Sequence, residues 1–495
     1  MADGRYDACV VGSGPNGLAG ALTLARAGLR VLVVEGAERP GGGCRTESLT
    51  LPGFRHDTCS TAHPLAAASR FFRDFGLADH GVELLHPQVV YGHALDGGRA
   101  AVVRRSVEET AQGLGADAEA YRRLFGPLSR QGRQLADWLL SSQRRPPAHP
   151  LALARFGLLG LRPASALVAR YRSEAARALF AGVAAHAMRP LERPPSGAVG
   201  LFLATLAHTV GWPVVAGGSQ QLTDAMVAAL EQAGGTLETG RWLGSLGELP
   251  ATPATLLDVT PRQLLQLAPG RLPDGYRRAM ERFRYGSGVF KADYALSAPV
   301  PWRSPELQLA GTVHLGGTFA EVAASERAVA RGEHPPSPYV LTVQASLVDP
   351  SRAPQGQHTL WAYCHVPAGS DVDMGPALEA QLERFAPGFR DLVLGRSGRT
   401  AREQEQHDPN YVGGDIASGR QDLRQTLLRP GLRWNPYRTP IPGVYLCSAS
   451  TTPGPGVHGR CGELAARSAL ADVFHLGATG EYRRSRRGAP REIEV

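Results

Sequence analysis

The clearest chemical signal in the sequence lies near the N-terminus, where Gly12-Ser13-Gly14-Pro15-Asn16-Gly17 follows a run of apolar residues. In a G-x-G-x-x-G spacing, the first glycine allows a tight turn and the second lets the backbone approach a pyrophosphate. The third allows the following helix to pack closely on a sheet. Glu35 ends the next apolar run, and its carboxylate suits a ribose hydroxyl but disfavours a 2′-phosphate. These residues predict a dinucleotide-binding site.

A second glycine-rich segment, Gly41-Gly42-Gly43-Cys44-Arg45, follows shortly after Glu35. The guanidinium of Arg45 can bind a phosphate with two parallel hydrogen bonds. Three glycines followed by an arginine are not expected of an NAD dehydrogenase at this position. The segment resembles the second fingerprint of large two-domain flavoproteins, in which these residues contact the pyrophosphate of FAD. Contacts to FAD are therefore expected from Gly42, Gly43 and Arg45.

Lys291 is the only lysine among the 53 Lys and Arg residues of the chain, and it lies in the apolar run GVFKADYALSAPVPW. A buried lysine can lower its pKa and handle a proton, whereas an arginine keeps its proton. Two structural alternatives stay open: a lysine that extends its ammonium group to solvent, or one paired with Asp293 on the same face of the strand.

The elements that position these residues are expected to alternate between strand and helix. Residues 6–11 and 30–34 predict buried strands, joined by an apolar helix that ends before Gly28. Further strands are expected in 235–246, 285–297, 311–323, 338–348 and 444–447, and helices in 107–142, 164–190, 219–235 and from about 462. The apolar stretch 151–171 predicts either an internal helix pair over a cavity or a lid that contacts a membrane.

Several motifs together resemble the phytoene desaturase-like branch of the flavin amine oxidase superfamily. They are GSGPNG, PGGGCRT, HDTCSTAHPLA, VAGGSQQLTDAM, LLDVTPRQLL, GVFKADYALSAPVPW, WAYCHVP, DPNYVGGDIASG and YLCSASTTPGPGVHG. The resemblance implies an α/β fold in which a Rossmann-like FAD-binding domain is interleaved with an α+β substrate-binding domain. The FAD-binding domain would comprise residues 1–85, 215–275 and 435–495. The substrate-binding domain, with a mixed sheet and a helical lid, would comprise 86–214 and 276–434.

The same resemblance implies roles for individual residues. The chain would run past the flavin at Thr61, Ala62 and His63, and backbone near Trp242 would contact the adenine. A glycine loop with Gly456, Val457 and His458 would close the FAD site. Many members place a carboxylate at the position of Ala449, where Ser448 or Ser450 could supply a weaker hydrogen bond. The catalytic candidates are Lys291, near a water beside the flavin, His63 and His458 for proton transfer, and Tyr411 as a cavity wall; structural roles for both histidines stay open.

The expected function is an FAD-dependent dehydrogenase or desaturase that removes hydride from an apolar small molecule. An isoprenoid, a polyene or another natural-product intermediate would be such a substrate, with O2, a quinone or NAD(P) as electron acceptor. The alternatives are an amine-oxidase-like enzyme that uses O2 and a flavin-dependent isomerase or cyclase. A lipid-binding escort without redox chemistry is a minor alternative, because the dinucleotide motifs are intact.

The composition of the chain argues against several other classes of function. The net charge of +8 is spread along 495 residues without an aromatic-interleaved basic patch, so no nucleic-acid partner is expected. The six cysteines form no Cys-x-x-Cys pair, which predicts a reduced protein without a metal site. No stretch of 18 uncharged apolar residues is present, so no transmembrane helix is expected. A cytoplasmic protein is predicted, either free or in peripheral contact with a membrane.

Overall fold

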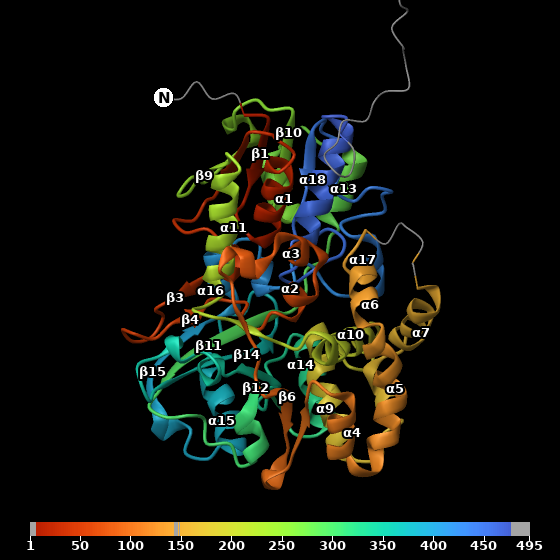
Figure 1. Ribbon diagram of the computed structural model, residues 1–495, viewed down its shortest axis with the longest axis vertical. Helices are drawn as coiled ribbons and strands as arrows, with labels where there is room; N and C mark the ends of the chain where they lie inside the picture. Colours follow the sequence, from red (N-terminus) through yellow and green to blue (C-terminus); the bar gives the residue numbers. More distant parts are fainter. Residues whose placement is uncertain (1–5, 143–146, 148, 477–495) are drawn as a thin grey trace, which may run out of the picture.

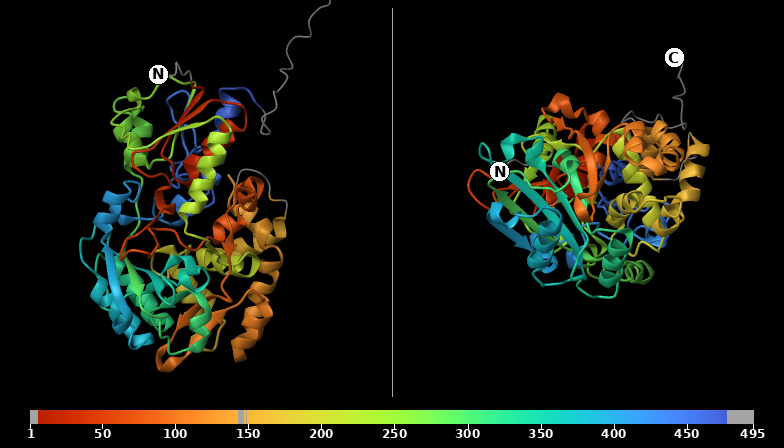
Figure 2. Two further views of the ribbon diagram at one scale, coloured as in Figure 1. Left: turned by 60° about the vertical axis from the view of Figure 1, so that its left-hand side comes forward. Right: turned by 90° about the horizontal axis from the view of Figure 1, so that it is seen from below.

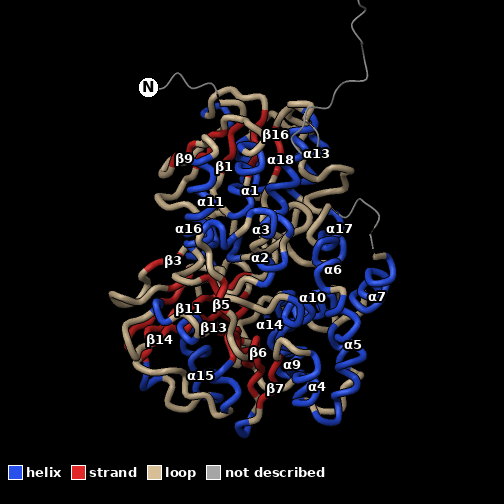
Figure 3. The backbone as a smooth tube through the Cα atoms, in the orientation of Figure 1, coloured by secondary structure: helices blue, strands red, loops and turns tan. Residues whose placement is uncertain are grey.

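A computed structural model describes residues 6–142, 147 and 149–476 of the chain. In the view of Figure 1, a parallel sheet with its helices lies at the top, and a mixed sheet lies below it on the left. A group of helices lies below on the right, and Figure 3 shows that this part is almost entirely helical. The expected α/β class with a second, mixed-sheet part is confirmed.

The upper part is built on a five-stranded parallel sheet in the order β16, β10, β1, β2, β9. Apolar runs that are largely buried on both faces form four of these strands: β1 (Ala8–Val11), β2 (Val31–Val34), β10 (Ala254–Leu257) and β16 (Val444–Leu446). The fifth, β9 (Thr236–Glu238), is a partly exposed strand at the edge of the sheet. One face packs against α1 (Pro15–Ala25), α11 (Gln220–Gln232) and α18 (Arg460–Asp472). The other packs against α12 (Pro261–Leu267) and α13 (Asp274–Glu281).

The lower part contains a seven-stranded sheet that is antiparallel except between β6 and β12. Its order is β15 (Val393–Arg399), β11 (Gly288–Leu296), β14 (His358–Val366), β13 (Val340–Val343), β12 (Ala310–Leu315), β6 (Val89–Ala94) and β7 (Ala100–Val103). One face packs on α15 (Gly375–Phe385). Trp361 and Tyr363 of β14 point from the opposite face toward the helical group.

The helical group packs around the buried helix α10 (Ser196–Thr209). Its other members are α4 (Val107–Gly113), α5 (Ala118–Arg130), α6 (Gly132–Leu139), α7 (Pro150–Gly160), α8 (Ala164–Val168) and α9 (Glu174–Ala184). The two views in Figure 2 show these helices beside the mixed sheet. The stretch 151–171 forms the helix pair α7 and α8, and Phe156 of α7 lines the cavity described below.

The chain crosses between the upper and lower parts at two small sheets. β3 (Thr46–Glu47) pairs with β4 (His56–Asp57), and β5 (Leu84–Leu85) pairs with β8 (Val214–Val215). The second pair joins the segment that leaves the upper part to the segment that returns to it. The domain boundaries given above stay a prediction.

Three expected strands are shorter than predicted, and the one expected over 338–348 ends at Val343, before a 3-10 helix (Ala345–Leu347). After β9, the Arg241 N–H donates to the Glu35 carbonyl and the chain turns at Gly240, which takes a φ of 67°. After β12, helix α14 (Phe319–Ala330) begins at a capping box formed by Thr318 and Glu321. The Thr-x-x-Glu spacing is a helix-start signal that outweighs the apolar run following it.

Within the described residues, no helix has both the length and the apolar character needed to cross a membrane.

Candidate functional site

A cavity of about 1290 Å³ lies where the parallel sheet, the mixed sheet and the helical group meet. One end is lined by most of the residues predicted for cofactor binding: Gly12, Gly14, Pro15, Asn16, Glu35, Gly42, Gly43, Arg45, Thr61, Ala62, Trp242, Ser448, Gly456 and Val457. His63 and Tyr411, two of the catalytic candidates, also line it. Gly17, Lys291 and His458 do not belong to the lining.

The dinucleotide loop connects β1 to α1 and holds Glu35 in place. The backbone N–H and hydroxyl of Ser13 donate to Glu35 Oε2 at 2.8 and 2.5 Å, and the Ala37 N–H donates to Oε1 at 2.9 Å. Oε2 thus accepts two hydrogen bonds, and Oε1 keeps a lone pair that can accept one from a ligand. Gly17 lies behind the loop, where an added Cβ would collide with the Gly12 carbonyl, as close packing of the helix on the sheet requires.

Asp258 follows β10 and lies directly beneath the dinucleotide loop. Its Oδ2 accepts a hydrogen bond from the Gly17 N–H at 2.8 Å. Burial raises the pKa of Asp258 to about 7, and the carboxylates of Asp408 and Glu35 add to the effect. The carboxyl group is therefore half-protonated near neutral pH, which limits its repulsion of a phosphate. Sequence reasoning assigned no role to this residue, although the position directly after a core strand is a signal for one.

Arg45 is buried beside the second glycine-rich segment, which approaches the first. A Cβ added to Gly42 would lie 3.2 Å from the Gly14 Cα. The Arg45 Nε donates to the Gly42 carbonyl at 3.0 Å, and one of its terminal nitrogens lies 2.9 Å from His407 Nε2. These contacts hold the guanidinium at the cavity wall, where its charge can face an anionic ligand.

Trp242 lies at the rim of the cavity and is 65% exposed. Its ring covers Gly36, where an added Cβ would collide with the indole. The exposed ring and the absence of a side chain at position 36 leave a flat surface beside Glu35. Contact with an adenine there stays a prediction.

The C-terminal glycine loop lies at the opposite wall and leads into α18. The Ser448 hydroxyl donates to the Val259 carbonyl at 2.7 Å, so its oxygen can only accept a hydrogen bond from a ligand. His458 Nε2 lies 3.0 Å from the Gly454 carbonyl, and Nδ1 accepts from the Arg460 N–H at 3.0 Å. Both nitrogens of His458 are therefore engaged in the loop, and the residue shapes the loop rather than facing the cavity.

The contacts of His63 determine which of its nitrogens carries the proton. The Ser219 hydroxyl donates its single proton to the Ser60 carbonyl at 2.5 Å. Its oxygen must therefore accept from His63 Nε2, which lies 2.8 Å away. The Nδ1 atom is left with a lone pair, is buried and has no partner among the described residues. Burial lowers the pKa of His63 to about 4, so the ring is neutral near pH 7.

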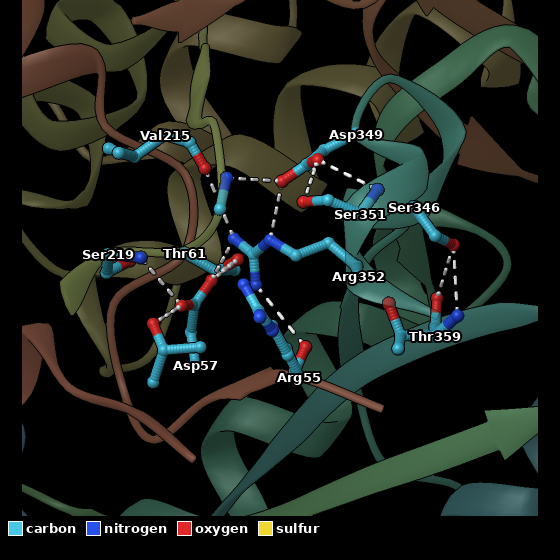
Figure 4. A network of polar contacts seen from close by, with 12 residues as sticks. Arg55, Asp57, Thr61, Val215, Ser219, Ser346, Asp349, Ser351, Arg352 and Thr359 are labelled. Atoms are coloured by element: carbon cyan, nitrogen blue, oxygen red, sulfur yellow. Dashed lines mark hydrogen bonds and ion pairs between the residues drawn. The ribbon is translucent and has the colours of Figure 1, made fainter. Parts of the chain in front are cut away.

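A buried ionic network fixes Ser219 in turn (Figure 4). Asp57 accepts from the Ser219 N–H at 2.9 Å and from Arg352 at 2.9 Å, and Arg352 also donates to Asp349 at 2.8 Å. Burial alone would raise the pKa of Asp57, but the Arg352 guanidinium and the hydrogen bonds outweigh it and hold the pKa well below its usual range. The network joins β4 and the start of α11 to the segment that precedes β14.

Lys291 lies behind the cavity wall in the middle of β11. Its ammonium group is buried and hydrogen-bonded to Asp293, which was one of the two structural alternatives. It also lies 5.7 Å from the ring centroid of Trp361, and its partner across the sheet is Tyr363. Burial, opposed by the Asp293 carboxylate, lowers the pKa of Lys291. Trp361 and Tyr363 line the cavity, and Lys291 lies beside these aromatic rings on the same face of the sheet.

The other end of the cavity is largely apolar. It lies between the mixed sheet and the helices α6, α7 and α10, and its lining includes Leu140, Leu153, Phe156, Leu161, Met188, Val199, Phe202, Leu203, Trp212, Leu341, Val343, Trp361 and Ile416. The lining acids of the described chain, Glu35, Asp258 and Asp408, all lie near the glycine loops. Sequence reasoning predicted the helices but not which of their faces meet the sheet, because that depends on the packing of distant segments.

The residues present fit a dinucleotide ligand. The loops that approach one another carry glycine at the positions where a side chain would intrude, including Gly14, whose added Cβ would lie 2.8 Å from Asp258 Oδ2. Asn16 Oδ1, His63 Nδ1 and Trp361 Nε1 are buried at this cavity and have no hydrogen-bond partner among the described residues. The volume also exceeds the roughly 300–1,000 Å³ of a pocket for one drug-sized ligand.

Comparison with known proteins agrees with this geometry. Residues 10–75 match the family model described as an NAD(P)-binding Rossmann-like domain. The rat pyridine nucleotide-disulfide oxidoreductase domain-containing protein 2 is 26% identical over 561 residues, which cover 95% of this chain and 94% of that protein. Phytoene dehydrogenase of Streptomyces griseus is 28% identical over 430 residues, covering 78% of this chain and 77% of that protein.

Among solved structures, putrescine oxidase bound to putrescine has the same fold. It superposes with a TM-score of 0.59 at 17% identity, over 95% of this chain and 99% of that chain. Cyclohexylamine oxidase from Brevibacterium oxydans superposes with a TM-score of 0.56 at 15% identity. With the Rossmann match and the dehydrogenase relatives, these findings indicate an oxidoreductase that is similar to phytoene dehydrogenase in sequence and to the amine oxidases in fold.

Proposed function

We propose that the protein binds FAD at the glycine-loop end of the cavity and dehydrogenates an apolar small molecule at the other end. The observation that carries this proposal is the continuity of the cavity. One space joins the dinucleotide loop and Arg45 to the apolar lining formed by the helical group and the mixed sheet. A cofactor and a substrate held in the same space can exchange a hydride without a diffusible carrier.

The FAD would be held by groups of known chemistry. Glu35 would accept hydrogen bonds from the adenosine ribose, and the loop from Gly12 to Gly14 and the start of α1 would contact the pyrophosphate. Arg45 would neutralise part of its charge. When bound, the flavin supplies the acceptor for a hydride, a reaction that no amino-acid side chain performs.

The apolar end favours a hydrocarbon-rich substrate such as an isoprenoid or a polyene. Burying such a molecule against Phe156, Phe202 and Leu203 removes apolar surface from water, at about 25 cal/mol per Å². An ammonium substrate would need a carboxylate or a polar cage, and the lining acids of the described chain lie at the opposite end. Dehydrogenation of an apolar molecule is therefore favoured over amine oxidation.

His63 is suited to accept a proton or a hydrogen bond at this site. Its Nδ1 lone pair is fixed by the Ser219 contact, and the neutral ring remains a base above about pH 4. Catalytic roles for Lys291 and Tyr411 stay predictions. Tyr411 lies at the wall beside Gly43, where an added Cβ would collide with its hydroxyl.

The test is an anaerobic titration of the purified protein, after its cofactor has been identified by release and mass spectrometry. Terpenoids and polyenes, amines, and NAD(P)H are added separately while the flavin absorbance is followed. Bleaching by an apolar compound, followed by reoxidation with O2, a quinone or NAD(P)+ tested one at a time, supports the proposal.

Three other outcomes contradict it. Bleaching by amines with peroxide release on reoxidation would indicate an amine oxidase. Bleaching by NAD(P)H alone would indicate a reductase. A protein that contains no flavin and binds none when FAD is added would indicate a non-redox role.

A further inference from the structure

One histidine interrupts the apolar lining of the cavity, and a second lies behind it. His186 follows α9 in a short 3-10 helix (Ala185–Ala187), and His314 lies on β12. Their Nε2 atoms lie 3.1 Å apart. His186 is partly exposed and lines the cavity, whereas His314 is buried behind it. The function proposed above does not use either residue.

Hydrogen-bond geometry indicates how the protons are distributed over this pair. A bond between the two Nε2 atoms requires one to donate and the other to accept. The Nδ1 atom of His314 is buried without a partner among the described residues. A buried N–H without a partner is rarer in proteins than an unpaired acceptor, so His314 carries its proton on Nε2 and donates to His186. His186 must then carry its own proton on Nδ1.

The surroundings keep both rings neutral and leave His186 Nδ1 to the cavity. Burial lowers the pKa of His186 to about 3, and burial with the neighbouring rings lowers the pKa of His314 well below its usual value. The nearby His93 ring bonds the Gly317 carbonyl at 2.7 Å, and His365 bonds Glu326 at 2.7 Å. Among the described residues, no group is hydrogen-bonded to His186 Nδ1. The Trp212 ring packs against His186, and Gln421, which also lines the cavity, donates to the His186 carbonyl rather than to the ring.

We propose that the substrate is an apolar molecule carrying a hydrogen-bond-accepting oxygen, such as a carbonyl, and that His186 Nδ1–H donates to this oxygen. The inference rests on the proposed function, because it places the apolar substrate in the same cavity. A pure hydrocarbon would leave the Nδ1–H unpaired when it displaced water, whereas a ketone of the same skeleton would satisfy it. The histidine pair thus determines the class of the substrate and places its oxygen beside His186.

The experiment compares two probes that differ only by a carbonyl group, menthone and p-menthane, with the flavin-loaded protein. Binding is measured by quenching of the intrinsic tryptophan fluorescence, since Trp212 and Trp361 line the cavity. The variants are His186→Phe, which removes the donor, and His186→Gln, whose amide can still donate. Met188→Leu is the control, because it changes a neighbouring lining residue that carries no donor.

We expect His186→Phe to weaken menthone binding about fivefold, the effect of one neutral hydrogen bond, and to leave p-menthane binding unchanged. His186→Gln should retain part of the menthone affinity, and Met188→Leu should change both probes alike. The infrared carbonyl stretch of menthone bound to the wild type should lie at a lower frequency than that of menthone in an apolar solvent. In His186→Phe, the stretch of bound menthone should lie near the apolar-solvent value.

Equal effects of His186→Phe on both probes, or an unshifted carbonyl stretch in the wild type, would overturn the role of His186 while leaving the proposed apolar substrate intact. If neither probe binds the flavin-loaded wild type, the apolar substrate class fails and the inference fails with it.

Discussion

His63 and Asp258 both line the cavity, and burial favours the uncharged form of both side chains at pH 7. Burial lowers the pKa of the histidine to about 4 and raises that of the carboxyl group to about 7. His63 thus keeps a free lone pair, and Asp258 changes its charge in the physiological range. The motif around His63 predicted its place in the site. Asp258 was not predicted, although it directly follows a core strand, and the fold places it beneath Gly17.

The pKa of Asp258 predicts a measurable pH dependence of stability. An unfolded chain has an Asp pKa of about 3.9, so between about pH 4 and the folded pKa near 7 the folded protein binds a proton that the unfolded chain lacks. The stabilisation from this group is therefore complete below about pH 4 and is lost as the pH rises toward 7. We expect the unfolding temperature of Asp258→Asn to fall less than that of the wild type as the pH rises from 5 to about 7.

The measurement is the unfolding temperature of both proteins at closely spaced pH values. Asp79→Asn, which changes an exposed carboxylate, is the control and should follow the wild type. Parallel curves for the wild type and Asp258→Asn would show that the carboxyl group does not titrate in this range.

At the scale of elements, the dinucleotide-binding part depends on the close approach of α1 and α18. These helices come from opposite ends of the chain and meet at glycines. A Cβ added to Gly462 would collide with the backbone carbonyl of Asn16 in the first turn of α1. The approach also brings the C-terminal glycine loop to the wall opposite the dinucleotide loop.

Gly462→Ala is therefore expected to destabilise the protein by about 1–3 kcal/mol. It should also weaken cofactor retention, because α1 and α18 cannot separate without displacing the first turn of α1 at Asn16. Gly126→Ala is the matched control. Gly126 lies within α5, where an added Cβ would make only an ordinary contact with Arg130 at 3.7 Å, so this variant should be neutral or slightly stabilising. Urea unfolding and cofactor content after dialysis measure both effects. Equal stability of the two variants would contradict this account of the packing.

Local patterns predicted most of these elements. The strand, glycine loop and helix at residues 8–25 follow from an apolar run and glycine spacing. Gly28 predicted the end of the helix, and the structure shows it with a φ of 85°, which glycine adopts readily. The prediction of a strand through residue 319 was wrong, because it gave an apolar run more weight than the capping box at Thr318. The apolar end of the site could not be predicted, since its wall joins α10 to β13 and β14, and no local pattern encodes that contact.

At the scale of the whole molecule, the upper and lower parts are joined by the buried network of Asp57, Arg352 and Asp349. Arg352 precedes β14, whereas Asp57 lies on β4 and holds Ser219 at the start of α11. Because Ser219 fixes His63, a contact between the two parts also determines the protonation of a group that faces the cavity.

Arg352→Met should destabilise the protein by about 3–5 kcal/mol, because it leaves the Asp57 carboxylate buried without its ionic partner. The double variant Asp57→Asn/Arg352→Met removes the unpaired charge at Asp57, although Asp349 still lacks Arg352, and should recover part of that loss. Urea unfolding of the wild type, both single variants and the double variant forms a double-mutant cycle. A double variant whose loss equals the sum of the single losses would show that the two side chains are not coupled.

If cofactor and substrate occupy one continuous cavity, blocking its apolar end should stop the reaction without removing the cofactor. Val199 lines this end from α10, so Val199→Trp would fill space without touching the glycine loops. We measure the rate at which the apolar compound that bleaches the wild-type flavin bleaches the variant under anaerobic conditions, with Val199→Ala as control. We expect the bleaching rate to fall at least about tenfold in Val199→Trp, whereas the flavin content and the rate of reduction by dithionite should stay unchanged. Bleaching at the wild-type rate in Val199→Trp would contradict occupation of one continuous cavity.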